Sequence, residues 1–114
     1  MIVEYIFSFL LGGIITLAIT YLEASGFPTL SGLAALFPIF TWVSYLFIGK
    51  LGGAEIVSQH SLFVLLGTIF AWIPYMLIIY YFAPKIGVLK SILFGLIVFI
   101  ILALIFIKLY GGIK

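Results

Sequence analysis

The sequence predicts an all-α membrane protein with four transmembrane helices in an up-down bundle, and two observations support this fold class. Hydrophobic residues make up 67% of the 114 residues and charged residues 7%, whereas a soluble domain is about 50% apolar and about 25% charged. Four apolar runs, near 3–22, 30–48, 62–83 and 88–107, each approach the ~20 residues that a helix needs to cross a bilayer. Little chain is left over, so we expect one transmembrane domain over residues 1–114.

The four runs are predicted to be helices and not strands. They lack the polar alternation of membrane-barrel strands, and a backbone in lipid must satisfy its own hydrogen bonds. The first run opens with Glu4 in place of the usual lysines and is longer than a signal-peptide core. We therefore expect it to remain as a helix of the mature protein.

Small residues recur at helical spacing in three of the runs. At this spacing, small side chains let two helix backbones approach closely, and hydroxyl groups can bond across the contact. The helix faces that carry these small residues are predicted to pack against one another within one bundle. A subunit interface is the alternative. The predicted helix-packing residues are Ser8, Gly12, Gly13, Thr16 and Thr20 in the first run, Gly67 and Ala71 in the third, and Ser91 and Gly95 in the fourth.

A ten-residue aromatic phrase occurs twice, as "IFTWVSYLFI" in the second run and "IFAWIPYMLI" in the third. Trp42 and Tyr45 share one helix face, as do Trp72 and Tyr75, because residues three apart are neighbours on a helix. Both tryptophans fall near the bilayer centre, where a buried indole N–H needs a partner. We therefore expect both indoles to face protein and to approach each other or those of a dimer partner, with Thr41, Ser44 and Thr68 as the polar partners nearby.

Prolines accompany both copies of the phrase. Pro38 and Pro74 each remove an amide donor and are predicted to kink their helices. Kinked helices with aromatic and hydroxyl side chains at mid-depth are typical of a small-molecule or lipid pocket. Plain packing aromatics are the other interpretation of the same residues.

Three connectors join the runs: "EASGFPT", "GKLGGAEIVSQHS" and the tight turn "PKIG". The tight turn predicts that the third and fourth helices are antiparallel neighbours. Glu55 and His60 are expected in the long central loop, where two ligand-type residues do not make a metal site. With no Cys and three glutamates in the chain, we predict no enzyme activity, no metal and no cofactor.

Charge indicates the orientation only weakly. Lys50, Lys108 and Lys114 fall on the side of the N-terminus, and Lys85 and Lys90 on the other side. Because positive charge marks cytoplasmic loops, we expect a multi-pass cell-membrane protein with cytoplasmic termini, with insertion in both orientations as an alternative. The net charge of +2 does not predict nucleic-acid binding.

Three segments resemble the GlpM-type small membrane proteins: "FLLGGIITLAI", "LSGLAALFPIFTWVSYLFIG" and "IPYMLIIYYFAPKIG". The resemblance rests on the glycine pair Gly12 and Gly13, and on the run from Gly32 to Pro38. It implies a four-helix integral membrane protein of unsettled activity, linked by the family's name to glycerol-phosphate metabolism and exopolysaccharide production. It implies no catalytic residues.

Two functions follow as hypotheses. The first is a transporter-like dimer, or one that handles a lipid or small molecule, with membrane lipids as its partners and the doubled aromatic phrase lining its pocket. An ionisable residue within the membrane, which proton-coupled export requires, is missing from the second and third runs. The second hypothesis is a structural accessory subunit that packs its small-residue faces against a larger membrane complex.

Overall fold

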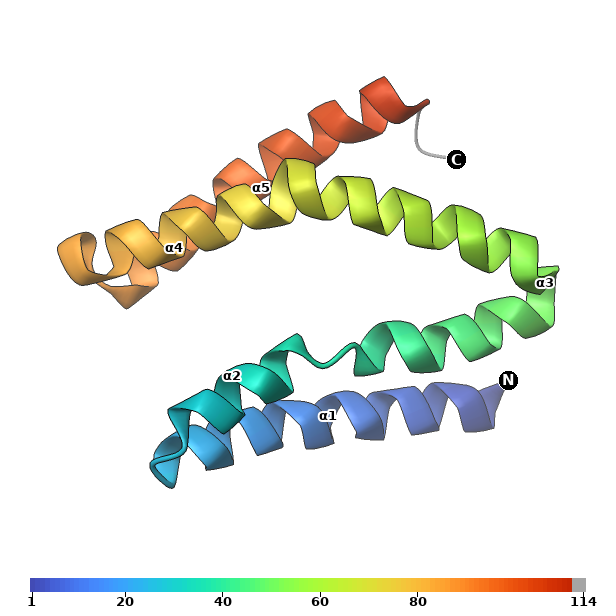
Figure 1. Ribbon diagram of the computed structural model, residues 1–114, viewed down its shortest axis with the longest axis horizontal. Helices are drawn as coiled ribbons and strands as arrows, with labels where there is room; N and C mark the ends of the chain where they lie inside the picture. The colour runs from blue at the N-terminus through green and yellow to red at the C-terminus, as the bar shows by residue number, and fades with distance from the viewer. Residues whose placement is uncertain (112–114) are drawn as a thin grey trace. The chain divides into compact units, whose positions relative to one another are not determined.

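The computed structural model describes residues 1–111, except for the side chains of residues 39 and 40. The described chain is all-α, which confirms that part of the predicted fold class, and it divides into two compact units, Met1–Val57 and Ser58–Lys114. Figure 1 shows the helices in chain order: α1 (Ile2–Ala24), α2 (Pro28–Leu36), α3 (Ile39–Gly67), the π-helix η1 (Thr68–Trp72), α4 (Ile73–Ile86) and α5 (Val88–Tyr110).

Three stretches of the described chain are long and apolar enough to cross a membrane. They are Ile2–Ala24, Pro28–Ile86 and Val88–Tyr110. The middle stretch has 59 residues, which at ~1.5 Å per residue is about three times the hydrocarbon thickness of a bilayer. Multiple apolar helices of this length are consistent with a multi-pass membrane protein.

The first unit begins as a hairpin of α1 and α2. The turn between them is shorter than the predicted "EASGFPT" connector, because Pro28 already opens α2 at a position where its missing amide costs nothing. Gly26 has φ +88°, a left-handed conformation that favours glycine. Across the hairpin, the Ser31 hydroxyl on α2 donates to the Ile19 carbonyl oxygen on α1 at 3.1 Å.

The face of α1 that packs is apolar and branched. Its half-buried residues include Leu11, Ile15, Ala18, Ile19 and Leu22, which recur at the i, i+4, i+7 spacing of one helix face. At the other end of α1, the Lys50 ammonium on α3 lies 4.0 Å from a Glu4 carboxylate oxygen. The first half of α3 therefore ends beside the start of α1.

Pro38 breaks its helix completely, where a kink was predicted. Helix α2 ends at Leu36, and Phe37 is extended with φ −62° and ψ 129° before α3 begins at Ile39. A proline pushes the preceding residue out of the helical region and cannot donate to the turn before it. The predicted second span, 30–48, therefore consists of two helices.

The predicted central loop is helical, so the assignment of "GKLGGAEIVSQHS" to a loop is wrong. Helix α3 runs through it, interrupted at Gly53, which has φ 83° and ψ −179°. Only glycine adopts this backbone region easily. Polar residues such as Glu55 and Gln59 do not prevent a helix, because its hydrogen bonds are made by the backbone. The chain changes direction at one residue and not over a long loop.

The second unit is a helical hairpin with a defect in its first arm. Within η1 the amide of Ile73 donates to the carbonyl oxygen of Thr68, five residues earlier, and Pro74 follows at the start of α4. A π-turn is a common way to accommodate a local disruption of the helix ladder. A kink was expected at Pro74, and the structure has a π-helix just before this proline.

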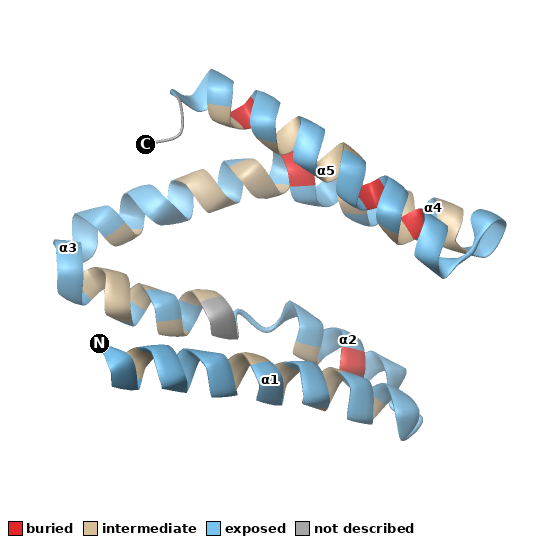
Figure 2. Cartoon of the chain, turned by 180° about the vertical axis from the view of Figure 1, so that it is seen from behind, coloured by how far each residue is buried: buried red, intermediate tan, exposed pale blue. Residues whose placement is uncertain are grey.

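Helices α4 and α5 run alongside each other (Figure 1). The turn is tighter than the predicted "PKIG", since Gly87 alone, with φ +96°, separates them. Figure 2 shows that few of the described residues are buried. Those of the second unit are Ala71, Ser91, Gly95 and Phe106, while most large apolar side chains are exposed. Exposed apolar helix faces of this kind are what a lipid environment stabilises.

Candidate functional site

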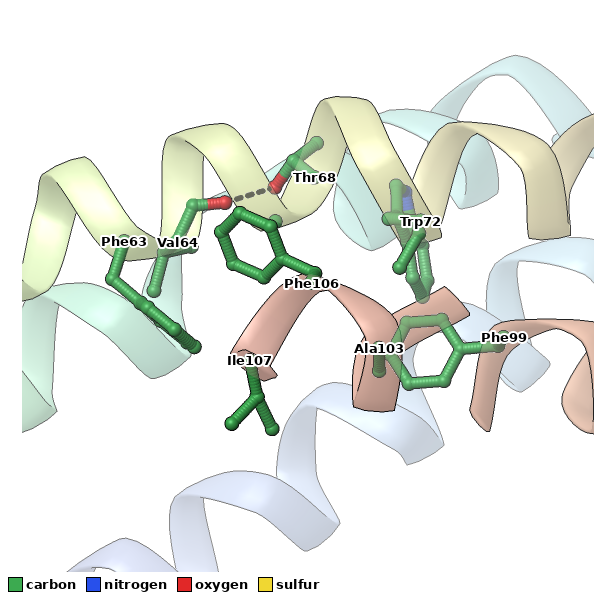
Figure 3. Close-up of a pocket in the computed structure, with 10 residues that line it drawn as sticks. Phe63, Val64, Thr68, Trp72, Phe99, Ala103, Phe106 and Ile107 are labelled. Carbon is green, nitrogen blue, oxygen red and sulfur yellow. Dashed lines mark hydrogen bonds between the residues drawn. The ribbon is translucent and has the colours of Figure 1, made fainter. Parts of the chain in front are cut away.

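The second unit contains a cavity of about 310 Å³ between the first arm of the hairpin and α5. Its volume is at the lower end of the range for ligand sites in proteins. Figure 3 shows side chains from both arms facing this space. The lining residues are Phe63, Val64, Gly67, Thr68, Ala71 and Trp72 from α3 and η1, and Phe99, Ala103, Phe106 and Ile107 from α5.

Small residues create the space. Gly67, Ala71 and Ala103 present at most a methyl group to the cavity, whereas the residues around them are bulky. A Cβ atom added at Gly67 would lie 3.3 Å from the Phe106 ring, so the glycine lets that ring approach the helix backbone. The cavity is the gap left between the small residues and the aromatic rings.

An aromatic cluster forms one end of the cavity. The rings of Phe63 and Phe106 have centroids 5.1 Å apart, and Tyr110 lies 5.1 Å from Phe63 in an edge-on arrangement. Phe70 is 5.7 Å from Phe106. Offset and edge-on pairs at these distances are favourable, so the cluster holds α3 and α5 together at the end of the cavity.

The polar content of the lining is small. Thr68 donates its hydroxyl to the Val64 carbonyl oxygen at 2.7 Å (Figure 3), and it keeps lone pairs that can accept. The indole N–H of Trp72 is the other side-chain polar group among the lining residues. None of these side chains titrates near neutral pH. The site is therefore suited to holding an apolar group and not to acid–base chemistry.

Tyr75 packs beside the cavity and not into it. Its ring is 5.2 Å from Trp72 and 6.2 Å from Phe99, and it covers Gly95, where an added Cβ would be 3.1 Å from the ring. Ser91 is fully buried and its hydroxyl donates to the Val88 carbonyl oxygen at 2.8 Å. Gly95 and Ser91 thus lie at the contact between α4 and α5.

The cavity holds two of the seven residues predicted for a pocket, Trp72 and Thr68. Trp42, with 57% of its surface exposed, lies in the first unit, together with Thr41, Ser44 and Tyr45. The Thr41 hydroxyl donates to the Pro38 carbonyl oxygen at 3.0 Å. Trp72 itself is 49% exposed. Both indoles were expected to face protein, but neither is buried within this chain.

The small residues of α1 are placed differently from those of the second unit. Ser8, Gly13, Thr16 and Thr20 are exposed, and Gly12 is half-buried. The hydroxyls of Thr16 and Thr20 donate at 3.0 Å to carbonyl oxygens four residues earlier in the same helix. These hydroxyls therefore bond along α1. Apart from its chain neighbours and the backbone of its own helix, nothing in the described residues lies within 4 Å of a Cβ placed on Gly13.

Glu55 and His60 lie on α3 and not in a loop. In residues 1–111, no group of three or more acidic, His or Cys side chains is placed to hold a metal ion. The lining residues that the sequence did not predict as part of a pocket include Phe63 and Val64 on α3 and four residues on α5. Phe99, Ala103 and Phe106 recur at i, i+4 and i+7, a spacing that marks one helix face and was available in the sequence.

Comparison with protein-family models, with curated proteins and with solved structures finds no match to this chain. The resemblance to the GlpM-type proteins therefore stays a prediction from the segments that carry it.

Proposed function

We propose that this chain is a four-span integral membrane protein that handles lipid, with an acyl chain bound in the cavity of the second unit. The observation that carries the proposal is the cavity itself, about 310 Å³ lined almost entirely by apolar and aromatic side chains. Its lining offers no titratable group, which favours binding over catalysis.

Four spans account best for the long middle stretch. Gly53 divides it into 28–52, which contains α2 and the first part of α3, and 54–86. At ~1.5 Å per helical residue, 25 and 33 residues correspond to about 38 and about 50 Å. Each is enough to cross a hydrocarbon core of ~30 Å once. Under this layout the polar residues after Gly53, up to Ser61, extend the third span into the interface.

The depth of the cavity supports an acyl chain as its occupant. Trp72 lies ten residues into the predicted span 62–83, so the inner end of the cavity is near the bilayer centre. The side chain of Trp72 is half exposed, and in a membrane such a surface meets hydrocarbon and not water. A lipid tail matches this lining in both polarity and depth.

A homodimer fits the exposed face of α1. Ser8, Gly13 and Thr16 are small, exposed residues on this face, and close backbone approach between membrane helices uses such residues. The exposed ring of Phe9 on the same face would pack against the partner helix beside them. The same face equally suits the alternative, an accessory subunit packed against a larger membrane complex. A stable dimer of the purified chain in detergent would support the first, and a chain that is stable only with a partner would support the second.

Lipid occupancy of the cavity is testable by tryptophan quenching. In a Trp42→Phe background, Trp72 is the one remaining tryptophan, and phosphatidylcholine brominated along its tails quenches nearby indoles. We expect Ala103→Leu to reduce the quenching of Trp72, because the larger side chain fills the cavity that the tail would enter.

The control is Ala35→Leu, the same substitution at an exposed position of α2 in the other unit. It should leave the quenching of Trp72 unchanged. If Ala103→Leu also leaves the quenching unchanged, the tails reach Trp72 only as bulk lipid, and the binding function is wrong.

A further inference from the structure

We infer that the cavity is the tail site of an anionic phospholipid, whose phosphate binds at the end of α5 that carries Lys108. This inference rests on the proposed function and adds to it the class of headgroup. It draws on the charge of the second unit, the length of the cavity and the polar residues beyond its aromatic end.

The charge of the second unit is one-sided. Its residues, 58–114, include four lysines and no Asp or Glu, since the three acidic residues of the chain all lie earlier. Within the described part of the chain, the ion pairs both involve Glu4, and Lys108 takes part in neither. The lysines of this unit are Lys85, Lys90, Lys108 and Lys114.

Lys108 lies at the same end of α5 as the aromatic end of the cavity, about 100° around the helix from the lining residue Ile107. Ile107 lines the cavity and Lys108 follows it in the last turn of α5. From Phe99 to Ile107 the helix rises about 12 Å, close to the ~15 Å that half of a hydrocarbon core occupies. A tail that reaches Phe99 would therefore bring its headgroup to the level of Lys108.

Helix α3 supplies polar side chains beyond the same end of the cavity. Ser58, Gln59 and Ser61 lie within about a turn and a half of Phe63, the outermost lining residue of that helix. Ser61 donates its hydroxyl to the Ser58 carbonyl oxygen at 2.8 Å, while Gln59 is exposed. An amide donor and an ammonium group suit a phosphate with its glycerol oxygens.

An anionic phospholipid fits better than an uncharged one. A lysine near the membrane surface favours an anionic lipid by about fivefold, from the ~1 kcal/mol that each such residue contributes. The second unit has no Asp or Glu side chain to compete for Lys108. A fatty acid shares the anion and the tail but lacks the glycerol, so the test includes it.

The experiment compares headgroups at a fixed tail. The Trp42→Phe protein is placed in phosphatidylcholine vesicles that contain equal mole fractions of tail-brominated phosphatidylglycerol, phosphatidylcholine or fatty acid. We expect the brominated phosphatidylglycerol to occupy the site about fivefold more than the brominated phosphatidylcholine, and more than the fatty acid. Lys108→Gln should remove the preference for phosphatidylglycerol but keep the residual quenching by both phospholipids. Lys108→Arg should retain the preference, because it keeps the positive charge.

Two controls separate this site from general surface charge. Lys85→Gln removes a lysine at the opposite end of the hairpin, where the ammonium lies 4.4 Å from the centre of the Tyr81 ring, and it should keep the preference. The Trp72→Phe protein reports only from Trp42, in the other unit, and should show no headgroup preference.

Each result decides one of the two proposals. Equal quenching by the two phospholipids would overturn the headgroup site and leave the tail site standing. An equal loss of the phosphatidylglycerol preference in Lys85→Gln and Lys108→Gln would do the same. Stronger quenching by the fatty acid would also overturn it, in favour of a carboxylate ligand. Quenching that does not respond to Ala103→Leu with any of the three lipids would overturn the tail site, and with it the proposed function.

Discussion

Gly95 has almost no room for a side chain. A Cβ atom at this position would be 3.1 Å from the Tyr75 ring and 3.6 Å from Ile79, so the glycine sets how closely α4 and α5 approach. Membrane helices gain their association energy from such close packing and not from hydrophobic burial. By contrast, a Cβ atom on Gly13 of α1 meets nothing within 4 Å in the described chain.

We predict that Gly95→Val lowers the free energy of unfolding by about 1–3 kcal/mol, as overpacking a tight contact does. Reversible unfolding in mixed micelles measures it. The matched control, Gly13→Val, makes the same change within a helix of the same length, and it should cost less. Equal effects at the two positions would mean that the contact between α4 and α5 is loose.

At the scale of elements, the chain's interior prolines have different effects. Pro38 separates α2 from α3 completely, whereas Pro74 follows a π-helix that keeps the helix continuous. The amides in the first turn of α3 lack a helical partner because the turn before them is not helical. At Pro28 the same residue type opens a helix without disrupting one.

We predict that Pro38→Ala joins α2 to α3. The new amide and the restored turn would give the amides of residues 39–41 carbonyl partners, and their hydrogen exchange in micelles should slow by at least tenfold. Pro28→Ala should change exchange little, because the first amide of α2 has no helical acceptor in either case. Unchanged exchange at 39–41 would show that tertiary packing, and not the proline, holds the break open.

At the scale of the whole molecule, the proposed four-span layout would decide which residues share a membrane surface. In that layout, Lys50 and Lys108 would lie on the side of the N-terminus, and Ser25 and Lys85 on the other side. The contact between Lys50 and Glu4 agrees with this for the first unit. Three lysines against two give a small bias toward cytoplasmic termini, which we propose as the orientation.

Cysteine labelling tests the layout directly, since the native chain has no Cys. Single cysteines at Lys50 and Ser25 should react with a membrane-impermeant reagent from opposite sides of oriented vesicles, and cysteines at Lys50 and Lys108 from the same side. Labelling of Lys50 and Lys85 from one side would contradict four spans, because it would place an even number of crossings between them.

The small charge bias makes a further prediction. Adding two lysines between Ser25 and Thr29, a segment that has none, should shift a C-terminal topology reporter between compartments. A reporter that stays in place would show that something other than charge sets the orientation.

Composition, run length and the lack of polar alternation determined that this is an all-α protein with apolar helices of membrane-spanning length, because hydrocarbon admits only helices and closed barrels and barrel strands alternate in polarity. They also indicated the close neighbours α4 and α5, since a short connector leaves no other packing partner within reach. The small residues Gly67, Ala71, Ser91 and Gly95 were likewise visible as candidates for close contact.

Only the tertiary structure decided which of the small-residue helix faces pack against another helix. The small residues of α1 are mostly exposed while its Leu and Ile face packs on α2, because spacing marks a face without naming its partner. Polarity could not distinguish a helix from a loop at residues 49–61, since the backbone of either is satisfied outside hydrocarbon. The cavity, too, needed the structure: it forms where Phe106 of α5 meets Gly67 of α3, two residues 39 positions apart in the chain, and nothing in either segment specifies that meeting.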